Sequence, residues 1–315
     1  MQKPNSKLLI ITGPTGIGKS SLSVDLAMQF NGEIISSDSM QVYKGLDIGT
    51  GKIKELEMRG VAHHMLDIVG LDEEYSVGKY KNAAEKIIDD INSRGKLPIT
   101  AGGTGLYIEA LINGLEFGGV VGSEKLRAEL SILPKEELYE KLKNIDEKAC
   151  EKISINDTKR VIRALEIFYL TGKRKSDLEL EERQRLSVAQ SRYDYLCVVL
   201  TKDRDKLYKG INDRVDGMIK DGLIEEAGEL YERYMGVDAQ FKTAIGYKEL
   251  FEYFKGEMTM DRAIEAIKQN SRRYAKRQIT FFKHMRIDKV FVDVGESGAI
   301  NRVMDLVNEK LSLFN

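Results

Sequence analysis

The chain has 315 residues, of which 42% are hydrophobic and 31% charged, so it can bury one large core or two smaller ones and lacks the composition of a disordered protein. Its 49 Lys and Arg nearly balance its 50 Asp and Glu, so the net charge of the whole chain does not attract nucleic acid or an anionic membrane. A site for nucleic acid therefore has to be a local cluster of basic residues. Two cysteines without a CxxC pair are too few for a structural zinc or a disulfide framework, and no apolar run approaches a membrane span, so we expect a cytoplasmic protein without membrane association.

The N-terminal pattern is a strand, a glycine-rich turn and a helix. A short apolar run predicts a buried strand over residues 7–12, and apolar residues at helical spacing predict a helix that includes Leu22 and Phe30. Two more strands are predicted over 33–37 and 97–101, with a helical stripe between them. Because strands that alternate with helices form parallel sheets, we expect an α/β fold with a P-loop NTPase-like parallel sheet flanked by helices. The ligand site of such a sheet lies beyond the carboxyl ends of its strands.

The pattern changes after about residue 118. Strand-like runs are absent up to residue 192, and charged helical stretches such as 157–170 replace them. Strands are predicted again over 195–200 and around 290–294, with helical segments between them. We therefore predict a helical insertion domain, residues 119–191, within a discontinuous core domain, residues 1–118 and 192–315.

Residues 13–20, GPTGIGKS, fit the phosphate-loop pattern G-x-x-x-x-G-K-[ST], with the strand before and the helix after that the motif requires. Backbone N–H groups of such a loop surround phosphate oxygens, Lys19 supplies a positive charge, and the Ser20 hydroxyl can ligate Mg²⁺. A merely structural glycine turn is the alternative, and motif and context together favour phosphate binding. The motif leaves open which phosphate compound binds. The predicted phosphate site is Gly13, Pro14, Thr15, Gly16, Ile17, Gly18, Lys19 and Ser20.

Two further strand ends carry candidate site residues. Asp38 follows the second predicted strand, and a carboxylate beside a phosphate loop can face the reacting centre. Its alternative role is to cap a turn or a helix. The glycine tract 102–105 is either a tight turn or a loop that approaches a ligand, and we favour the ligand.

A basic tract covers residues 268–289, which carry eight Lys or Arg and one Asp, a local charge of +7. On a helix, the row of Arg272 and Lys276 lies beside the row of Arg273 and Arg277, so the tract predicts one broad cationic face. A solvated basic helix is the alternative. The net-acidic remainder of the chain favours a polyanion as ligand.

Two smaller clusters of polar residues are also present in the sequence. Lys159, Arg160 and Arg163 form a weaker basic cluster in the predicted insertion. His63 and His64 are adjacent and point apart on an extended segment, which suits a structural role better than a shared metal.

Seven motifs, in this order, resemble those of the tRNA dimethylallyltransferases, also called isopentenyl-diphosphate:tRNA isopentenyltransferases. The resemblance extends from about Leu8 to His284. Ser20 replaces a threonine found in many relatives, which keeps the hydroxyl. The printed sequence has no zinc-finger extension, so it resembles the short bacterial form. The motifs are GPTGIGKS (13–20), DSMQVYKGLDIGTGK (38–52), HHMLDI (63–68), AGGTGLYIEALINGL (101–115), NDTKRVIRALEI (156–167), GYKEL (246–250) and RRYAKRQITFF (272–282).

This resemblance implies transfer of a dimethylallyl group from dimethylallyl diphosphate to N6 of the adenosine 3′ of the anticodon, in tRNAs that read codons beginning with U. The glycine loop then holds the donor diphosphate rather than ATP, with Mg²⁺ as cofactor. Asp38 becomes the general base, Arg214 holds the leaving diphosphate, and Thr104 lies at the tRNA entrance. The implied contacts with the tRNA anticodon stem-loop are Asp38, Ser39, Met40, Gln41, Thr104, Lys159, Arg160, Val161, Ile162 and Arg163. The charge pattern adds Arg273 and Arg277, and we expect a monomer.

Two other classes of protein use the same loop. A small-molecule or nucleotide kinase binds ATP with Mg²⁺ and phosphorylates an acceptor, whereas the transferase labels tRNA from its prenyl donor. An RNA-binding GTPase or ATPase module hydrolyses nucleotide without any prenyl dependence. The absence of an NKxD motif in this sequence counts against the GTPase.

Overall fold

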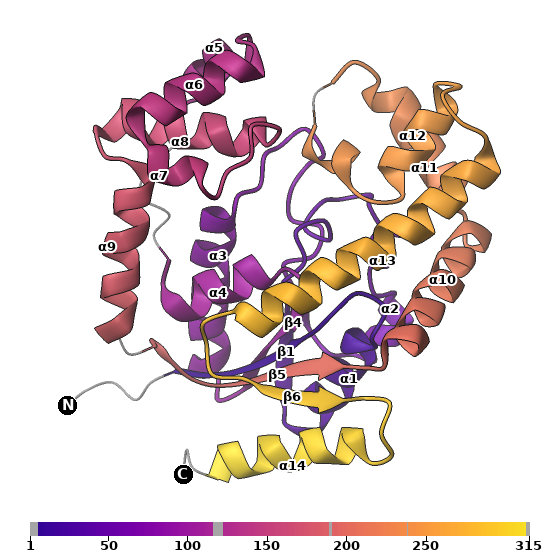
Figure 1. The fold of residues 1–315 in the computed structure, drawn as a ribbon. Helices are drawn as coiled ribbons and strands as arrows, with labels where there is room; N and C mark the ends of the chain where they lie inside the picture. Colours follow the sequence, from indigo (N-terminus) through magenta and orange to yellow (C-terminus); the bar gives the residue numbers. More distant parts are fainter. Residues whose placement is uncertain (1–5, 116–121, 189–190, 238, 313–315) are drawn as a thin grey trace. The chain divides into compact units, whose positions relative to one another are not determined.

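The computed structural model describes residues 6–115, 122–188, 191–237 and 239–312, which divide into two compact units (Figure 1). The larger unit comprises Met1–Ile112 and Arg192–Asn315, and the smaller comprises Asn113–Ser191. The larger unit is thus discontinuous and contains both chain ends. The expected boundary at residue 118 lies outside the described residues.

A six-stranded sheet forms the centre of the larger unit in the part of the chain that is described. Every neighbouring pair is parallel, and the order is β3-β2-β4-β1-β5-β6. The predicted α/β fold, a parallel sheet flanked by helices, is confirmed. The strands are β1 (Ser6–Thr12), β2 (Gly32–Ser36), β3 (His63–His64), β4 (Leu97–Gly102), β5 (Tyr193–Thr201) and β6 (Val290–Asp293).

Both faces of this sheet are covered, which explains why its strands are continuous apolar runs. In β1, Leu8 and Ile10 belong to one core cluster, with side chains of α3 and α4. Leu9 and Ile11 belong to the other, with side chains of α1, α10 and α14, because successive side chains of a strand point to opposite faces. Full burial of one such side chain contributes about 1.5–3 kcal/mol. These helices are α1 (Lys19–Gln29), α3 (Val77–Ser93), α4 (Gly105–Asn113), α10 (Arg204–Lys220) and α14 (Ala299–Ser312).

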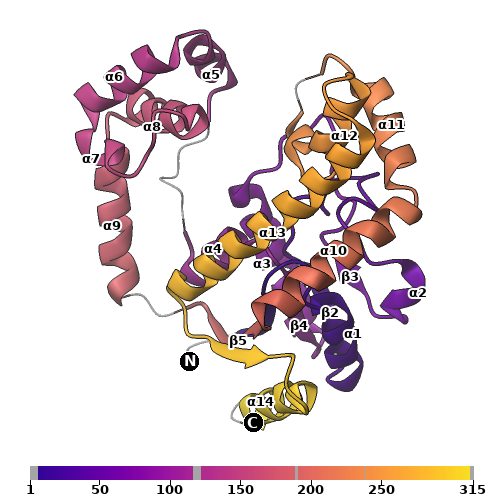
Figure 2. The same cartoon turned by 45° about the vertical axis from the view of Figure 1, so that its right-hand side comes forward.

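The longest described helix is α13 (Met260–His284), which lies beside α10 in the larger unit (Figure 2). Its first turn is capped by Thr259, whose hydroxyl accepts the N–H of Arg262. No helix in the described ranges has the length and apolarity that a bilayer crossing requires. The remaining elements of this unit are α2 (Glu55–Met58), α11 (Leu223–Tyr234), η2 (Gln240–Thr243) and α12 (Tyr247–Phe254).

The described part of the smaller unit is helical. Its core contains Leu138, Leu142 and Leu165. The helix that carries the weaker basic cluster begins after Asp157, whose carboxylate accepts the N–H of Arg160, and ends at Gly172 in the left-handed region at φ 71°. Its helices are α5 (Glu124–Ser131), α6 (Lys135–Ile145), α7 (Glu147–Cys150), α8 (Thr158–Thr171) and α9 (Lys175–Val188).

Candidate active site

The phosphate loop joins the end of β1 to the start of α1, so its backbone N–H groups lie at a helix N-terminus. Gly13 has a φ of 147°, and a Cβ there would lie 2.7 Å from the carbonyl oxygen of Leu200 in β5, so only glycine fits. The Lys19 ammonium donates to the carbonyl oxygens of Gly13 (3.0 Å) and Pro14 (2.8 Å). Burial and, next, the positive charge of Arg214 lower the Lys19 pKa to about 8.

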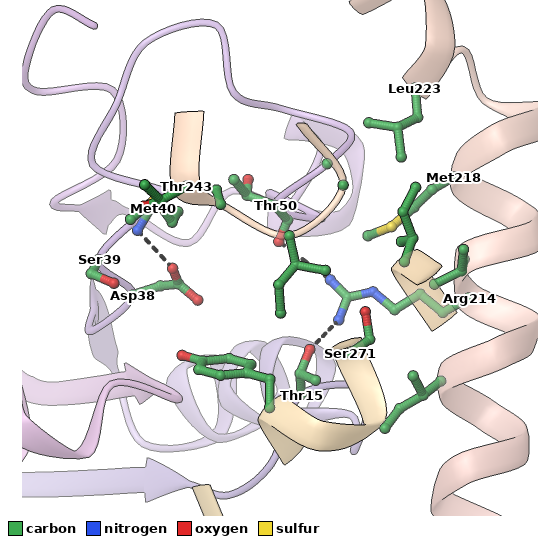
Figure 3. Close-up of a pocket in the computed structure, with 18 of the residues that line it drawn as sticks. Thr15, Asp38, Ser39, Met40, Thr50, Arg214, Met218, Leu223, Thr243 and Ser271 are labelled. Atoms are coloured by element: carbon green, nitrogen blue, oxygen red, sulfur yellow. Dashed lines mark hydrogen bonds between the residues drawn. The ribbon is translucent and has the colours of Figure 1, made fainter. Parts of the chain in front are cut away.

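Arg214 reaches this loop from α10. Its Nη1 donates to the Thr15 hydroxyl (2.9 Å) and its Nη2 to the carbonyl oxygen of Thr50 (3.3 Å). Burial lowers the Arg214 pKa, and the negative charge of Asp38 opposes that shift. Figure 3 shows the Asp38 carboxylate on one side of a cavity and the Arg214 guanidinium on the other. A cation and a potential base therefore share one site.

Asp38 follows β2 and does cap a turn, since one carboxylate oxygen accepts the N–H of Met40 (2.9 Å). Its second oxygen points into the cavity (Figure 3). Thr104 holds the same turn, because its hydroxyl accepts the N–H of Ser39 (3.1 Å) and its own N–H donates to the carbonyl of Ser37 (3.0 Å). The carboxylate is thus fixed while half of it stays available for chemistry.

Gln41 lies just beyond this turn and is held by two neighbours. Its side-chain oxygen accepts from the Ser36 hydroxyl (3.1 Å), and its side-chain nitrogen donates to the carbonyl of Thr50 (3.4 Å). The turn after β2 and the loop that carries Thr50 are therefore tied together.

Two neighbouring cavities meet at these residues. One, of about 560 Å³, lies over the phosphate loop from Thr15 to Ser20 and is also lined by Gln41. The other, of about 270 Å³, is lined by Ser39, Met40 and several apolar side chains. The residues that line both are Thr15, Asp38, Thr50, Arg214 and Tyr274. The apolar wall of the smaller cavity includes Ile211, Val215, Met218, Leu223 and Ile267.

Gln278 of α13 is a site residue that sequence reasoning missed. Its side-chain oxygen accepts the N–H of Thr15 (2.9 Å), and its nitrogen donates to the carbonyl of Gly103 (2.9 Å). It is 6% exposed and ties the phosphate loop to the glycine tract after β4. Tyr274, one turn earlier, was missed too; burial and, next, the charge of Asp38 raise the pKa of its hydroxyl to about 12. The only sequence signal was their place inside the RRYAKRQITFF motif.

The basic tract is divided by the structure. Arg273 and Arg277 are exposed, and Arg277 lies 5.6 Å from the Tyr274 ring centroid and lines the smaller cavity. Lys268 instead pairs with Asp216 of α10 at 2.7 Å, and Arg272 donates to Asn212 of the same helix. Of the two predicted rows, Lys276 is exposed together with Arg273 and Arg277, whereas Arg272 is half-buried against α10.

The segment 159–163 of the smaller unit also exposes only some of its side chains to solvent. Lys159 and Arg160 are exposed, whereas Val161 is 1% exposed and packs in the core of that unit, with Ile162 partly buried against it. Arg163 forms an ion pair with the buried carboxylate of Glu166. The charges that this segment offers to solvent are mainly those of Lys159 and Arg160.

His63 and His64 have separate partners, as their structural role requires. Nδ1 of His63 contacts the carbonyl of Val61 (2.9 Å), and Nε2 of His64 contacts the carboxylate of Glu33 (2.8 Å). Among the described residues, no group of three or more His, Cys, Asp or Glu is placed to hold a metal ion.

Comparisons with known proteins match nearly the whole chain. A sequence model of the IPP transferase family matches residues 41–285. A tRNA dimethylallyltransferase from Anoxybacillus flavithermus is 49% identical over 278 residues, 88% of each chain. The crystal structure of the full-length tRNA isopentenylpyrophosphate transferase from Bacillus halodurans is 42% identical, with a TM-score of 0.73 and 98% of each chain covered. A eukaryotic dimethylallyltransferase acting on tRNA is 32% identical, with a TM-score of 0.83 over 98% of this chain and 80% of that one.

Proposed function

This chain belongs to the IPP transferase family and is a prenyl-transferring tRNA dimethylallyltransferase, and from this premise we propose its substrates and its chemistry. It transfers the dimethylallyl group of dimethylallyl diphosphate to N6 of the adenosine 3′ of the anticodon, in tRNAs that read codons beginning with U. The products are N6-dimethylallyladenosine and diphosphate. One observation carries the proposal: a phosphate loop, a half-buried arginine and a carboxylate line the same pair of cavities.

The donor fits these cavities by its chemistry. Its diphosphate binds over the phosphate loop, where Lys19 and Arg214 supply positive charge at a helix N-terminus. Its five-carbon chain occupies the smaller cavity, against the apolar side chains of Val215 and Met218. That cavity, at about 270 Å³, is close to the lower end of the range for ligand pockets, about 300 Å³.

The acceptor is a weak nucleophile, so the reaction needs a good leaving group and a place for a proton. The N6 nitrogen attacks C1 of the donor, and the N–C bond forms while the allylic C–O bond breaks. Lys19, Arg214 and the loop N–H groups stabilise the charge that develops on diphosphate, at about 2.7–4 kcal/mol per well-placed donor. Asp38 accepts a proton from the amine as transfer proceeds. The adenine leaves its stack in the anticodon loop to reach the cavity.

The residues present suit Mg²⁺ only as an ion that binds together with the donor. Ser20 is exposed at the first turn of α1 and supplies a hydroxyl oxygen, while diphosphate oxygens and water supply the rest. The described residues lack a carboxylate cluster that would bind the ion by itself. When bound, Mg²⁺ offsets negative charge on the diphosphate.

The rival reaction is phosphoryl transfer from ATP by a small-molecule or nucleotide kinase, and one experiment separates the two. The protein is incubated with Mg²⁺, unmodified tRNA and either dimethylallyl diphosphate labelled in its carbon chain or ATP labelled in its terminal phosphate. We expect label in tRNA from the first donor alone. Phosphate transfer from ATP without prenyl transfer would assign the chain to the kinases.

Reversal of two charges on α13 is expected to weaken tRNA binding. Arg273→Glu together with Arg277→Glu removes two exposed cations that we assign to RNA phosphates. Because phosphate contacts release counterions, the slope of log affinity against log salt should become shallower by about 1 per lost contact. Filter binding of tRNA at several salt concentrations measures both affinity and slope.

The control for this charge reversal is Arg262→Glu, an exposed cation on the same helix outside the basic tract. It should leave both tRNA affinity and donor affinity nearly unchanged. Unchanged tRNA affinity and slope in the double variant would make the helix a solvated surface.

Donor affinity is expected to fall above about pH 8. The Lys19 pKa is lowered to about 8, so its ammonium is present below that pH and is progressively lost above it. Bound diphosphate favours the ammonium, so donor binding above this pKa requires uptake of a proton and weakens by up to about tenfold per pH unit. Calorimetric titration with the donor measures this trend. Lys19→Arg should shift the decline to higher pH, and constant affinity of the wild type to about pH 9.5 would contradict the assignment.

A further inference from the structure

Glu226 of α11 holds a loop of the active site, although it lines neither of the two cavities. One carboxylate oxygen accepts the backbone N–H groups of Asp47 (3.1 Å) and Ile48 (2.9 Å). The other accepts the N–H of Gly49 (3.0 Å) and the hydroxyl of Tyr247 (2.6 Å). Four donors therefore converge on one half-buried carboxylate.

The held loop continues directly into the contacts of Arg214. Thr50 follows the three clamped residues, and its carbonyl accepts from Arg214 Nη2 (3.3 Å). Gly51 comes next, with a φ of 56°, and a Cβ there would lie 1.8 Å from the same Nη2. On its other side the guanidinium donates to Thr15 in the phosphate loop. The loop thus forms one wall of the slot that the guanidinium occupies.

The partners of Glu226 explain why a carboxylate is needed. All four are donors, and an ionised carboxylate has acceptor sites for all of them. A glutamine has only one side-chain oxygen, and an NH₂ group replaces the other. That NH₂ group would face backbone N–H donors in either orientation: the N–H of Gly49 in one, and those of Asp47 and Ile48 in the other. Leaving such a donor without an acceptor is unfavourable, and the loop shifts to relieve it.

We propose that Glu226 is a positioning residue for the transfer reaction: it fixes residues 47–51 so that Thr50 and Gly51 hold the guanidinium of Arg214 against the phosphate loop. This inference rests on the proposed function, in which Arg214 holds the leaving diphosphate. Glu226 touches neither substrate and acts only through the loop. A merely structural tie would stabilise the fold without any coupling to Arg214.

The first test is Glu226→Gln in the full chain, with steady-state kinetics for dimethylallyl diphosphate at saturating tRNA. We expect kcat/KM for the donor to fall by about tenfold or more, up to the roughly 10²-fold that a misplaced group of this kind produces. The tRNA affinity should be unchanged. The matched control is Glu225→Gln, which removes an exposed carboxylate from the preceding position and should keep wild-type kinetics. Wild-type donor kinetics in Glu226→Gln would overturn the proposal.

A double-mutant cycle with Arg214→Met distinguishes positioning from general stabilisation. If Glu226 acts through Arg214, Glu226→Gln changes donor kcat/KM by less than about twofold in the Arg214→Met background. Independent multiplication of the two losses would overturn the positioning role and leave the proposed function intact. Normal donor kinetics in Arg214→Met would instead refute the proposed role of Arg214, and the positioning role with it.

Gly51→Ala breaks the same link without changing Glu226, and it keeps the test decisive if Glu226→Gln does not fold. Its methyl group would occupy the place of Arg214 Nη2, so the guanidinium has to move. We expect a comparable loss of donor kcat/KM at unchanged tRNA affinity. That loss should disappear in the Arg214→Met background. Full donor kinetics in folded Gly51→Ala would overturn the proposal.

Discussion

Lys19→Ala is expected to abolish prenyl transfer while tRNA binding persists. Lys19 is the cation of the phosphate loop, and its ammonium lies over the loop carbonyls of Gly13 and Pro14. Without it, the donor diphosphate loses a charge-assisted contact and the leaving group loses its partner in the transition state. Removal of one such group lowers the rate by at least about 10²–10³-fold. Transfer of labelled dimethylallyl to tRNA, at saturating donor and tRNA, measures this loss.

The matched control for this substitution is Lys209→Ala, which removes an exposed cation from α10 and should keep full activity. Melting temperatures of both variants separate lost chemistry from lost structure, because the Lys19 contacts also hold the loop. Near-normal turnover in Lys19→Ala would remove the phosphate loop from the mechanism.

Asp38→Asn is expected to bind both substrates and to transfer about 10²–10⁴-fold more slowly, the usual effect of losing a general base. Asparagine keeps the shape of the side chain and still accepts the Met40 N–H, so the turn after β2 should persist. What it lacks is a carboxylate oxygen that can take the N6 proton. Single-turnover rates at saturating donor and tRNA isolate that step.

The same variant also tests the other roles that an aspartate at a strand end can have. If Asp38 acted mainly on Mg²⁺, donor binding in Asp38→Asn would weaken and the rate would recover at saturating Mg²⁺. If it mainly capped its turn, the rate would stay near that of the wild type, because asparagine accepts the same N–H. A full single-turnover rate at saturation would end the general-base assignment.

The local part of this site could be predicted from sequence because its signals are local. The phosphate loop, its strand and its helix lie within 6–29, and Asp38 was placed at a strand end from the same kind of pattern. β3 was missed because a strand of two residues is too short to show a hydrophobic pattern. Strand ends elsewhere differed from the predictions by at most two residues, since buried parallel strands are continuous apolar runs.

The supporting contacts of the site could not be predicted, because they join distant parts of the chain. Gln278 bonds to Thr15 across 263 positions, and Glu226 bonds to Gly49 across 177. Gln278 lies within a basic helix and Glu226 within an acidic one, so the neighbouring sequence does not mark either residue as part of the site. The contact of Arg272 with Asn212 could not be predicted either, since which face of a helix is covered depends on its neighbour, here α10.

The most direct test of the central claim is nucleoside analysis of tRNA after reaction. Unmodified tRNAs are incubated with the protein, Mg²⁺ and dimethylallyl diphosphate, then digested and analysed by mass spectrometry, with Asp38→Asn as the matched reaction. The account predicts N6-dimethylallyladenosine, confined to the adenosine 3′ of the anticodon in tRNAs that read codons beginning with U, and little of it with the variant at equal times. Unmodified adenosine at that position with the wild-type protein, or the prenyl group on another atom or nucleotide, would contradict it.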